Sequence, residues 1–155
     1  MKIRDLLSKN SILLDLQGAD KIEVLTQMAH YMASIYNLPE ADLITRKILE
    51  READMSTGIG FGIAIPHGRI DKVDRVHMIA AQSLSGIAFN SIDEQPVHLL
   101  FMIISPANNS SEHTQVLSSL SRIMSYEGIR KKLLSATNAE VFLDLLIQAE
   151  DKYVE

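Results

Sequence analysis

The stretch Val97–Ser105, with the sequence VHLLFMIIS, is the part of this chain that most restricts its fold. A strand with one face in water alternates apolar and polar side chains, whereas Leu99–Ile104 is apolar throughout. A continuous apolar strand is typical of a sheet that is covered on both faces. The same run is far too short to cross a lipid bilayer. We therefore expect Val97–Ser105 to be a buried strand with helices on either side.

Apolar residues at helical spacing predict helices both before and after this strand along the chain. The predicted helices cover 21–36, a stretch from 39 or 40 to between 51 and 54, 110–126, 129–136 and 138–150. Capping boxes, Asp20 with Glu23 and Thr137 with Glu140, mark the starts of the first and last helix. Further strands are predicted over 12–16, 63–65 and 75–83, with a lesser one over 87–89. Because strands and helices do not alternate strictly, we predict an α/β sandwich, a mixed β-sheet flanked by helices on both faces.

Composition sets the broad class of the protein. The 155 residues, 46% of them hydrophobic, are expected to form a single domain over 1–155, since no linker or repeat divides them. The net charge of −5 is spread among interspersed acidic and basic residues, which argues against a nucleic-acid partner. The absence of cysteine excludes disulfides and thiolate chemistry. The charged opening MKIRDLLSKN is unlike a secretory signal, so a cytoplasmic protein is expected.

A glycine-rich stretch, STGIGFGIAIPHGR over Ser56–Arg69, is the candidate functional motif. A Walker phosphate loop would end in Gly-Lys-Ser/Thr, which is missing here. The dinucleotide fingerprint G-x-G-x-x-G fails as well, because Ile63 or Ile65 occupies the position of its last glycine. Strand-like residues, and not a helix, follow the glycines. Both nucleotide-binding interpretations therefore fail on spacing and on context.

The stretch leads into one histidine, His67, which follows Pro66. Glycines let backbone N–H groups surround a small anion, and proline fixes the local backbone. A neutral imidazole keeps one nitrogen lone pair near pH 7, as phosphoryl acceptance by histidine requires. A purely structural interpretation, tight turns beside a strand and a structural Pro-His pair, fits the same pattern. No H-x-x-x-H or H-E-x-x-H spacing occurs, so no metal site is expected.

Two segments together resemble a known family. "STGIGFGIAIPHG", preceded by Arg51 in "ILEREADM", closely resembles the signature of type-2 enzyme IIA domains of the bacterial phosphoenolpyruvate-dependent phosphotransferase system. "SIDEQPVHLLFMIISPANNSSEHTQVLSSLSRI" resembles the second characteristic block of that family, in which a histidine follows a buried strand. The resemblance covers most of the chain and implies the same α/β sandwich. It also implies a phosphotransferase, a carrier that holds a phosphoryl group on histidine.

The resemblance assigns roles to individual residues. His67 would accept the phosphoryl group from the histidine phosphocarrier protein, and Arg51 and His113 would assist. The predicted phosphoryl-binding groups are the Ser56 or Thr57 hydroxyl and the backbone amides of Gly58, Gly60 and Gly62. No cofactor and no metal are implied. From the pattern alone, Arg51 also fits a solvated arginine at a helix end, and His113 fits a capping or surface histidine.

The downstream partner separates two branches of the family. The lack of a membrane segment and the length of 155 residues favour the free-standing nitrogen-related branch, which regulates target proteins by phosphorylation-dependent docking. Its targets would include membrane transporters, contacted peripherally. The alternative is a fructose- or mannitol-type domain that relays the phosphoryl group to an enzyme IIB during sugar uptake. Phe61 departs from the asparagine that many nitrogen-branch members carry there, and it adds an apolar group beside the site.

Overall fold

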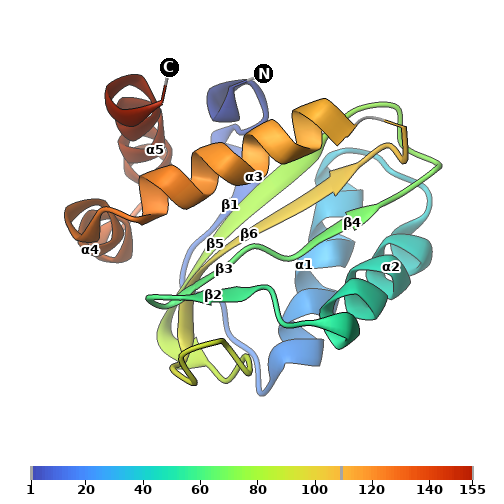
Figure 1. Cartoon of the computed structure of the whole chain (residues 1–155), viewed down its shortest axis with the longest axis horizontal. Coiled ribbons are helices and arrows are strands. Elements are labelled where there is room, and N and C mark those ends of the chain that lie inside the picture. Colours follow the sequence, from blue (N-terminus) through green and yellow to red (C-terminus); the bar gives the residue numbers. More distant parts are fainter. Residues whose placement is uncertain (1, 109, 155) are drawn as a thin grey trace.

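A mixed β-sheet forms the middle layer of the protein (Figure 1). The computed structural model describes residues 2–108 and 110–154. Within them the strands are β1 (Ile12–Leu13), β2 (Gly58–Gly60), β3 (Ile63–Ala64), β4 (His67–Arg69), β5 (His77–Ile87) and β6 (Val97–Ser105). Their order is β1-β5-β6-β3-β2, and β4 pairs with the end of β6 beyond β3. β6 is antiparallel to β5 and parallel to β3 and β4, so the predicted mixed sheet is confirmed.

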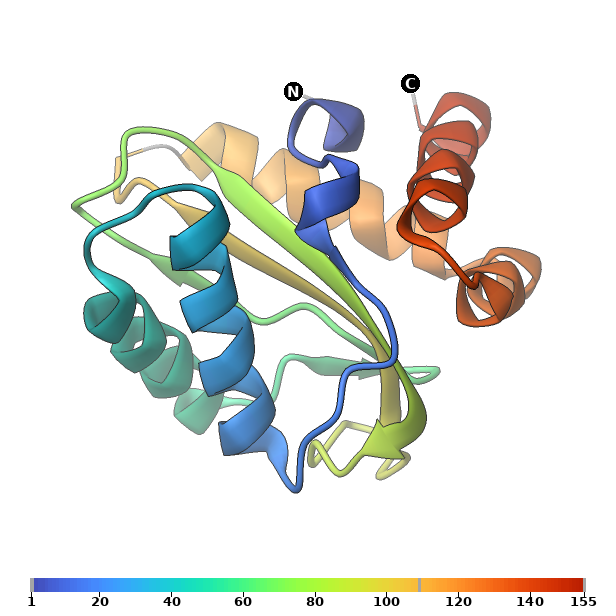
Figure 2. The same cartoon turned by 180° about the vertical axis from the view of Figure 1, so that it is seen from behind.

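Helices cover both faces of this sheet, as predicted. The helices α1 (Lys21–Ile35) and α2 (Ala41–Asp54) pack together on one face, which Figure 2 shows from behind. The helices α3 (Ser110–Met124), α4 (Glu127–Ser135) and α5 (Ala139–Tyr153) lie on the other. Two short 3-10 helices, η1 (Ile3–Asp5) and η2 (Lys9–Ser11), precede β1. The α/β sandwich is therefore the observed fold.

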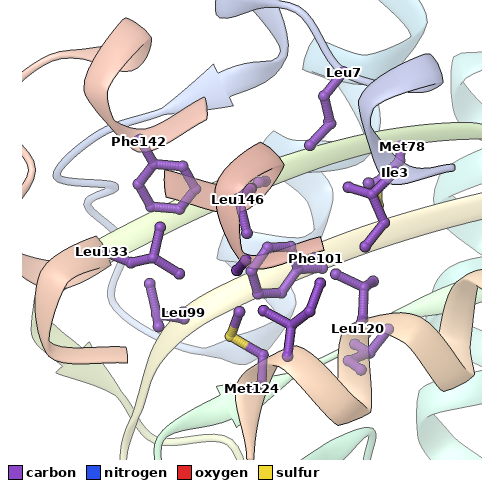
Figure 3. Packing of buried hydrophobic residues seen from close by; sticks show 14 of the residues in the cluster. Ile3, Leu7, Met78, Leu99, Phe101, Leu120, Met124, Leu133, Phe142 and Leu146 are labelled. Carbon is purple, nitrogen blue, oxygen red and sulfur yellow. The ribbon is translucent and has the colours of Figure 1, made fainter. Parts of the chain in front are cut away.

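Alternate side chains of β6 enter two separate cores. Leu99, Phe101 and Ile103 pack with α3 and α5, and Figure 3 shows Phe101 among Leu120, Met124 and Leu146. Leu100, Met102 and Ile104 point the opposite way and pack with α1 and α2. All six side chains are at most 1% exposed, which explains why this strand needs apolar residues at every position.

Several predicted boundaries were wrong, each for a local reason. The first strand stops at Leu13 and not at residue 16, because Asp15 has a left-handed φ of 49°. The strand predicted over 75–83 runs from His77 to Ile87, so that only Ile87 of the predicted lesser strand is in a strand. α5 is capped by Asn138, whose side chain accepts from Val141 N at 2.9 Å, and not by Thr137. The Asp20 cap of α1 is confirmed, with Glu23 N donating to Oδ1 at 2.8 Å.

The glycine-rich stretch is a β-hairpin followed by a further strand, which the sequence did not predict. β2 and β3 are antiparallel, and Gly60 and Gly62 at the turn have φ values of 96° and 78°. Phe61 between them has a φ of 58°, a value that costs a bulky side chain strain. Gly58 is needed for a different reason, since a Cβ there would lie 2.2 Å from the Ser91 hydroxyl oxygen. The glycines therefore serve close packing and a tight turn.

Within residues 2–108 and 110–154, none of the helices combines the length and apolar character that crossing a bilayer demands. The same residues contain no cluster of three or more histidine, cysteine or carboxylate side chains that could bind a metal ion.

Candidate functional site

His67 is the first residue of β4, the strand that lies beside the C-terminal half of β6. Its register places it opposite Ile103, and the preceding Pro66 carbonyl accepts from Ile103 N at 2.9 Å. Gly68 faces the other side of the sheet, with Ile48 of α2 close above it. Because side chains alternate along a strand, His67 points to the face that α3 covers. The Pro-His pair is thus fixed by sheet pairing.

The imidazole of His67 has one nitrogen bound and one free. Nδ1 lies 2.8 Å from the Ile65 carbonyl oxygen, which can only accept, so Nδ1 carries the proton. Nε2 then keeps its lone pair. The side chain is half-buried, and burial lowers the pKa of His67 below its ordinary value of 6.5, aided by the Arg51 charge and opposed by the bond to Ile65. The imidazole of His67 is therefore neutral near pH 7, with a lone pair on Nε2.

His113 approaches His67 from α3. The two ring centroids are 5.3 Å apart, with the rings inclined at 66°. His113 is only 5% exposed, and its Nδ1 lies 2.6 Å from the hydroxyl oxygen of Ser105 at the end of β6. Burial first, and then the charges of Arg69 and His67, lower the pKa of His113 to about 4. The structure thus brings together the two histidines that the sequence analysis singled out, both of them neutral.

Arg51 lies in the last turn of α2. Its Nη1 donates to the Met55 carbonyl at 2.8 Å, which holds the guanidinium at the helix end. Its charge is close enough to lower the pKa of His67. Within the described residues Arg51 has no carboxylate within ion-pair distance, so its charge is available to an anion at His67.

The hydroxyl groups predicted to bind a phosphoryl group already have partners. Thr57 is buried and donates to both oxygens of Glu52, from N at 2.8 Å and from Oγ1 at 2.5 Å. Lys21 donates to Glu52 at 3.0 Å. Ser56 donates to the Phe89 carbonyl at 2.9 Å and accepts from Gly58 N at 3.1 Å. The structure therefore occupies these donors with contacts inside the fold, and their part in phosphoryl binding stays a prediction.

The predicted glycine amides lie away from His67 along the sheet. Gly60 pairs with Ile63, and Gly62 precedes Ile63 in the chain. Ile63 is four residues from His67, which is about 13 Å in an extended strand. Gly58 is nearer, opposite Ala64, but its N–H is bound to Ser56. The structure does not bring Gly60 and Gly62 to His67, and a phosphoryl contact of these amides remains a prediction.

Arg69, Ser105 and Glu52 belong to this region and were not singled out from the sequence. Arg69 lies two residues after His67 on the same strand, so a period of two would have placed it on the same face. Ser105 orients His113, but its partner comes from another element and leaves no local signal. Glu52, on α2, accepts from Thr57 at the start of the hairpin and from Lys21 of α1, and its charge offsets part of the lowering of the His67 pKa.

An apolar strip extends from the site along the hairpin. Met55, Ile59 and Phe61 are 72%, 42% and 73% exposed. The Arg130 guanidinium of α4 lies over the Phe61 ring, 4.9 Å from its centroid. This strip combines exposed apolar side chains with a basic group over Phe61 at the hairpin turn, a composition that suits contact with another protein.

Comparisons with known proteins agree with one another. The profile of the family described as "Phosphoenolpyruvate-dependent sugar phosphotransferase system, EIIA 2" matches residues 5–149. The chain is 36% identical over 148 residues to a "PTS system fructose-specific EIIABC component" of Bacillus subtilis, covering 96% of this chain but only 23% of that protein. It is 30% identical to a "Nitrogen regulatory protein" of Bradyrhizobium diazoefficiens, covering 94% of this chain and 95% of the relative. The crystal structure of the nitrogen regulatory protein IIA-Ntr from Neisseria meningitidis superposes with a TM-score of 0.87 at 29% identity, over 93% of this chain and 98% of that one.

Proposed function

The chain belongs to the EIIA 2 family of the phosphoenolpyruvate-dependent sugar phosphotransferase system, and we propose that it carries a phosphoryl group on Nε2 of His67. The observation that supports this choice of atom is the bond between Nδ1 and the Ile65 carbonyl at 2.8 Å. A carbonyl partner keeps the proton on Nδ1 and leaves Nε2 as the nucleophile.

The transfer step needs no proton movement at His67. The Nε2 lone pair attacks the phosphorus of a donor phosphohistidine whose other ring nitrogen is protonated, the N–P bond to the donor breaks, and the donor histidine leaves as a neutral imidazole. The proton on Nδ1 of His67 remains bound to the Ile65 carbonyl oxygen throughout. Such a transfer depends on positioning and on compensation of the oxygen charges, with little other chemistry for the protein to perform.

His113 and Arg51 are the proposed assistants. We assign the Ser105 hydroxyl as the donor to Nδ1 of His113, 2.6 Å away, which would leave the proton of that ring on Nε2, where it can donate to a phosphoryl oxygen. The pKa of about 4 keeps His113 uncharged at neutral pH, so that it acts as a donor and not as a competing base. Arg51 offers a guanidinium that can bind two phosphoryl oxygens at once.

The donor in this proposal is the histidine phosphocarrier protein, and the acceptor depends on the branch. The likeness to nitrogen regulatory proteins in sequence and in fold supports a regulatory carrier, which docks on target proteins in the cytoplasm according to its phosphorylation state. The higher identity to the fructose-specific protein supports the alternative, relay of the phosphoryl group to an enzyme IIB. Both roles use the same chemistry at His67.

Phosphoryl uptake tests the proposed function directly. The protein is incubated with phosphoenolpyruvate, enzyme I and the phosphocarrier protein, and the modified residue is mapped by mass spectrometry at alkaline pH. We expect one phosphoryl group per chain, on His67. No uptake, or uptake at another residue, would refute the proposal. Partners captured with the phosphorylated and unphosphorylated protein then separate the branches, since an enzyme IIB indicates relay and a kinase or transporter indicates regulation.

A further inference from the structure

Arg69 ends β4 on the same face as His67. Its register partner on β6 is Ser105, the residue whose hydroxyl holds Nδ1 of His113. Side chains of paired residues on neighbouring strands lie side by side on one face of a sheet. Arg69 is therefore placed next to the Ser105–His113 pair and two residues from the nucleophile. The charge of Arg51, on α2, also acts on His67, so the charges of two arginines from different elements act on the imidazole.

The guanidinium of Arg69 has little to bind in the unphosphorylated protein. Its Nη1 donates a long hydrogen bond to the Pro106 carbonyl, at 3.4 Å. No carboxylate lies within 4 Å of it among the residues that the structure describes, whereas Arg4, Arg46 and Arg75 each have one. A half-buried cation without a counter-ion is unfavourable, and an incoming anion relieves that cost.

The charge of Arg69 acts on both imidazole rings. It lowers the pKa of His113 second only to burial, and it also lowers the pKa of His67, in the same direction as Arg51. A positive charge that reaches both rings also reaches a group bound between them. A phosphoryl group carries close to two negative charges at neutral pH, which two guanidinium groups would balance.

We propose that Arg69 is a second cationic ligand of the phosphoryl group, binding its oxygens from the α3 side while Arg51 binds them from the α2 side. The inference rests on the proposed function, since it assumes that His67 is the acceptor. Rotation of the guanidinium away from Pro106 towards Nε2 of His67 would give two N–H donors to one phosphoryl group. Arg69 would then touch the reacting group and count as a catalytic residue.

The test compares Arg69→Gln with Arg75→Gln. Arg75 is an exposed arginine near β5 that pairs with Asp74, so its loss removes the same charge without touching the site. We expect Arg69→Gln to slow single-turnover transfer from the phosphorylated phosphocarrier protein by roughly ten- to a hundred-fold. We expect Arg69→Lys to recover part of that loss, because it keeps the charge but not the planar fork. Arg75→Gln should transfer at the wild-type rate.

Two further measurements separate a direct contact from a structural role. In the unphosphorylated protein, Arg69→Gln should raise the pKa values of His67 and His113, measured by NMR titration, whereas Arg75→Gln should leave them unchanged. In the wild type, phosphorylation should shift the side-chain Nε–H resonance of Arg69 more than that of Arg75, and this needs no variant to fold.

The outcomes distinguish this inference from the proposed function. Wild-type protein that takes up no phosphoryl group on His67 overturns both. Wild-type uptake with Arg69→Gln transferring as fast as Arg75→Gln, or an Arg69 resonance that does not respond to phosphorylation, overturns the role of Arg69 alone.

Discussion

The two imidazole rings of the site, His67 on β4 and His113 on α3, differ in what holds their Nδ1 atoms. A backbone carbonyl holds His67, and a serine hydroxyl holds His113. The carbonyl can only accept, so Nε2 of His67 keeps its lone pair, whereas the hydroxyl can donate and leave Nε2 of His113 with a proton. Burial is the first cause that lowers both pKa values, and the net lowering is larger for His113, whose pKa falls to about 4. The two imidazole rings, with centroids 5.3 Å apart, thus differ in the partner of Nδ1, and this difference suits Nε2 to accept in His67 and to donate in His113.

Loss of the nucleophile should have the largest effect. His67→Ala removes Nε2, so phosphoryl uptake from the phosphocarrier protein should fall to background while the fold is retained, because no core cluster includes His67. Uptake is measured with radiolabelled phosphoenolpyruvate, and folding by circular dichroism. His30→Gln, at an exposed histidine of α1, is the matched control and should label fully. Full labelling of His67→Ala would contradict the assignment of His67, and not His113, as the phosphoryl acceptor.

Loss of an assistant should slow transfer without preventing it. His113→Leu replaces the imidazole with an apolar side chain of similar bulk that offers no donor. Arg51→Gln removes a charged donor. Each should lower the single-turnover rate by roughly ten- to a hundred-fold, the worth of one charge-assisted hydrogen bond. Mass spectrometry should still find the phosphoryl group on His67. Unchanged rates in both variants would show that these residues are only neighbours of the nucleophile.

Acid should destabilise the protein through His113. The folded pKa of about 4 lies below the unfolded value of 6.5, so the unfolded chain binds more protons between these values. The contribution of His113 to the free energy of unfolding is therefore fully present above pH 6.5. It falls as the pH drops towards 4, by about 3 kcal/mol in all. Urea unfolding at several pH values should show that the free energy of unfolding depends less on pH in His113→Leu than in the wild type. Equal slopes in this window would contradict the assigned pKa.

Loss of the serine that orients His113 should have a smaller effect. Ser105→Ala leaves the imidazole in place but no longer fixes which nitrogen carries its proton. Transfer should slow by roughly fivefold, the worth of about 1 kcal/mol of neutral hydrogen bonding. The ¹⁵N shifts of the His113 ring report the tautomer directly, and they should change in this variant while those of His67 do not. A fixed Nε2–H tautomer in Ser105→Ala would show that the hydroxyl is not the cause.

The smallest effect is expected on the backbone itself. Phosphorylation should change the charge at His67 and the affinity of partners for the apolar strip of Met55, Ile59 and Phe61, not the fold. Added negative charge should weaken partners that bury apolar groups there and strengthen those that offer basic side chains. Amide shifts should change only near 51–69 and 105–116. Large shifts throughout α1 and α5 would instead show a global transition.

The sequence alone determined the layers of the fold and the identity of the nucleophile candidate. The apolar run of β6 required cover on both faces, and helical periodicity supplied it, because both signals are local and repeat along the chain. Pro66 and His67 stood out for the same reason, as neighbours within one motif. The interpretation of the glycines as anion donors did not foresee the hairpin, because a left-handed turn and an anion-binding loop both require glycine.

The resemblance named Arg51 and His113 as assistants of His67, but only the tertiary structure shows how these groups and Arg69 come near its ring. Arg51, Arg69 and His113 come from α2, β4 and α3, and sheet register together with helix packing brings them within reach of one ring. The partners of the two Nδ1 atoms were likewise beyond the sequence, since the Ile65 carbonyl and the Ser105 hydroxyl reach the rings only in the folded chain. Local sequence patterns contain only the spacing of side-chain types along one helix or strand. A site assembled from several elements depends on distances between residues far apart in the chain, which such patterns do not contain.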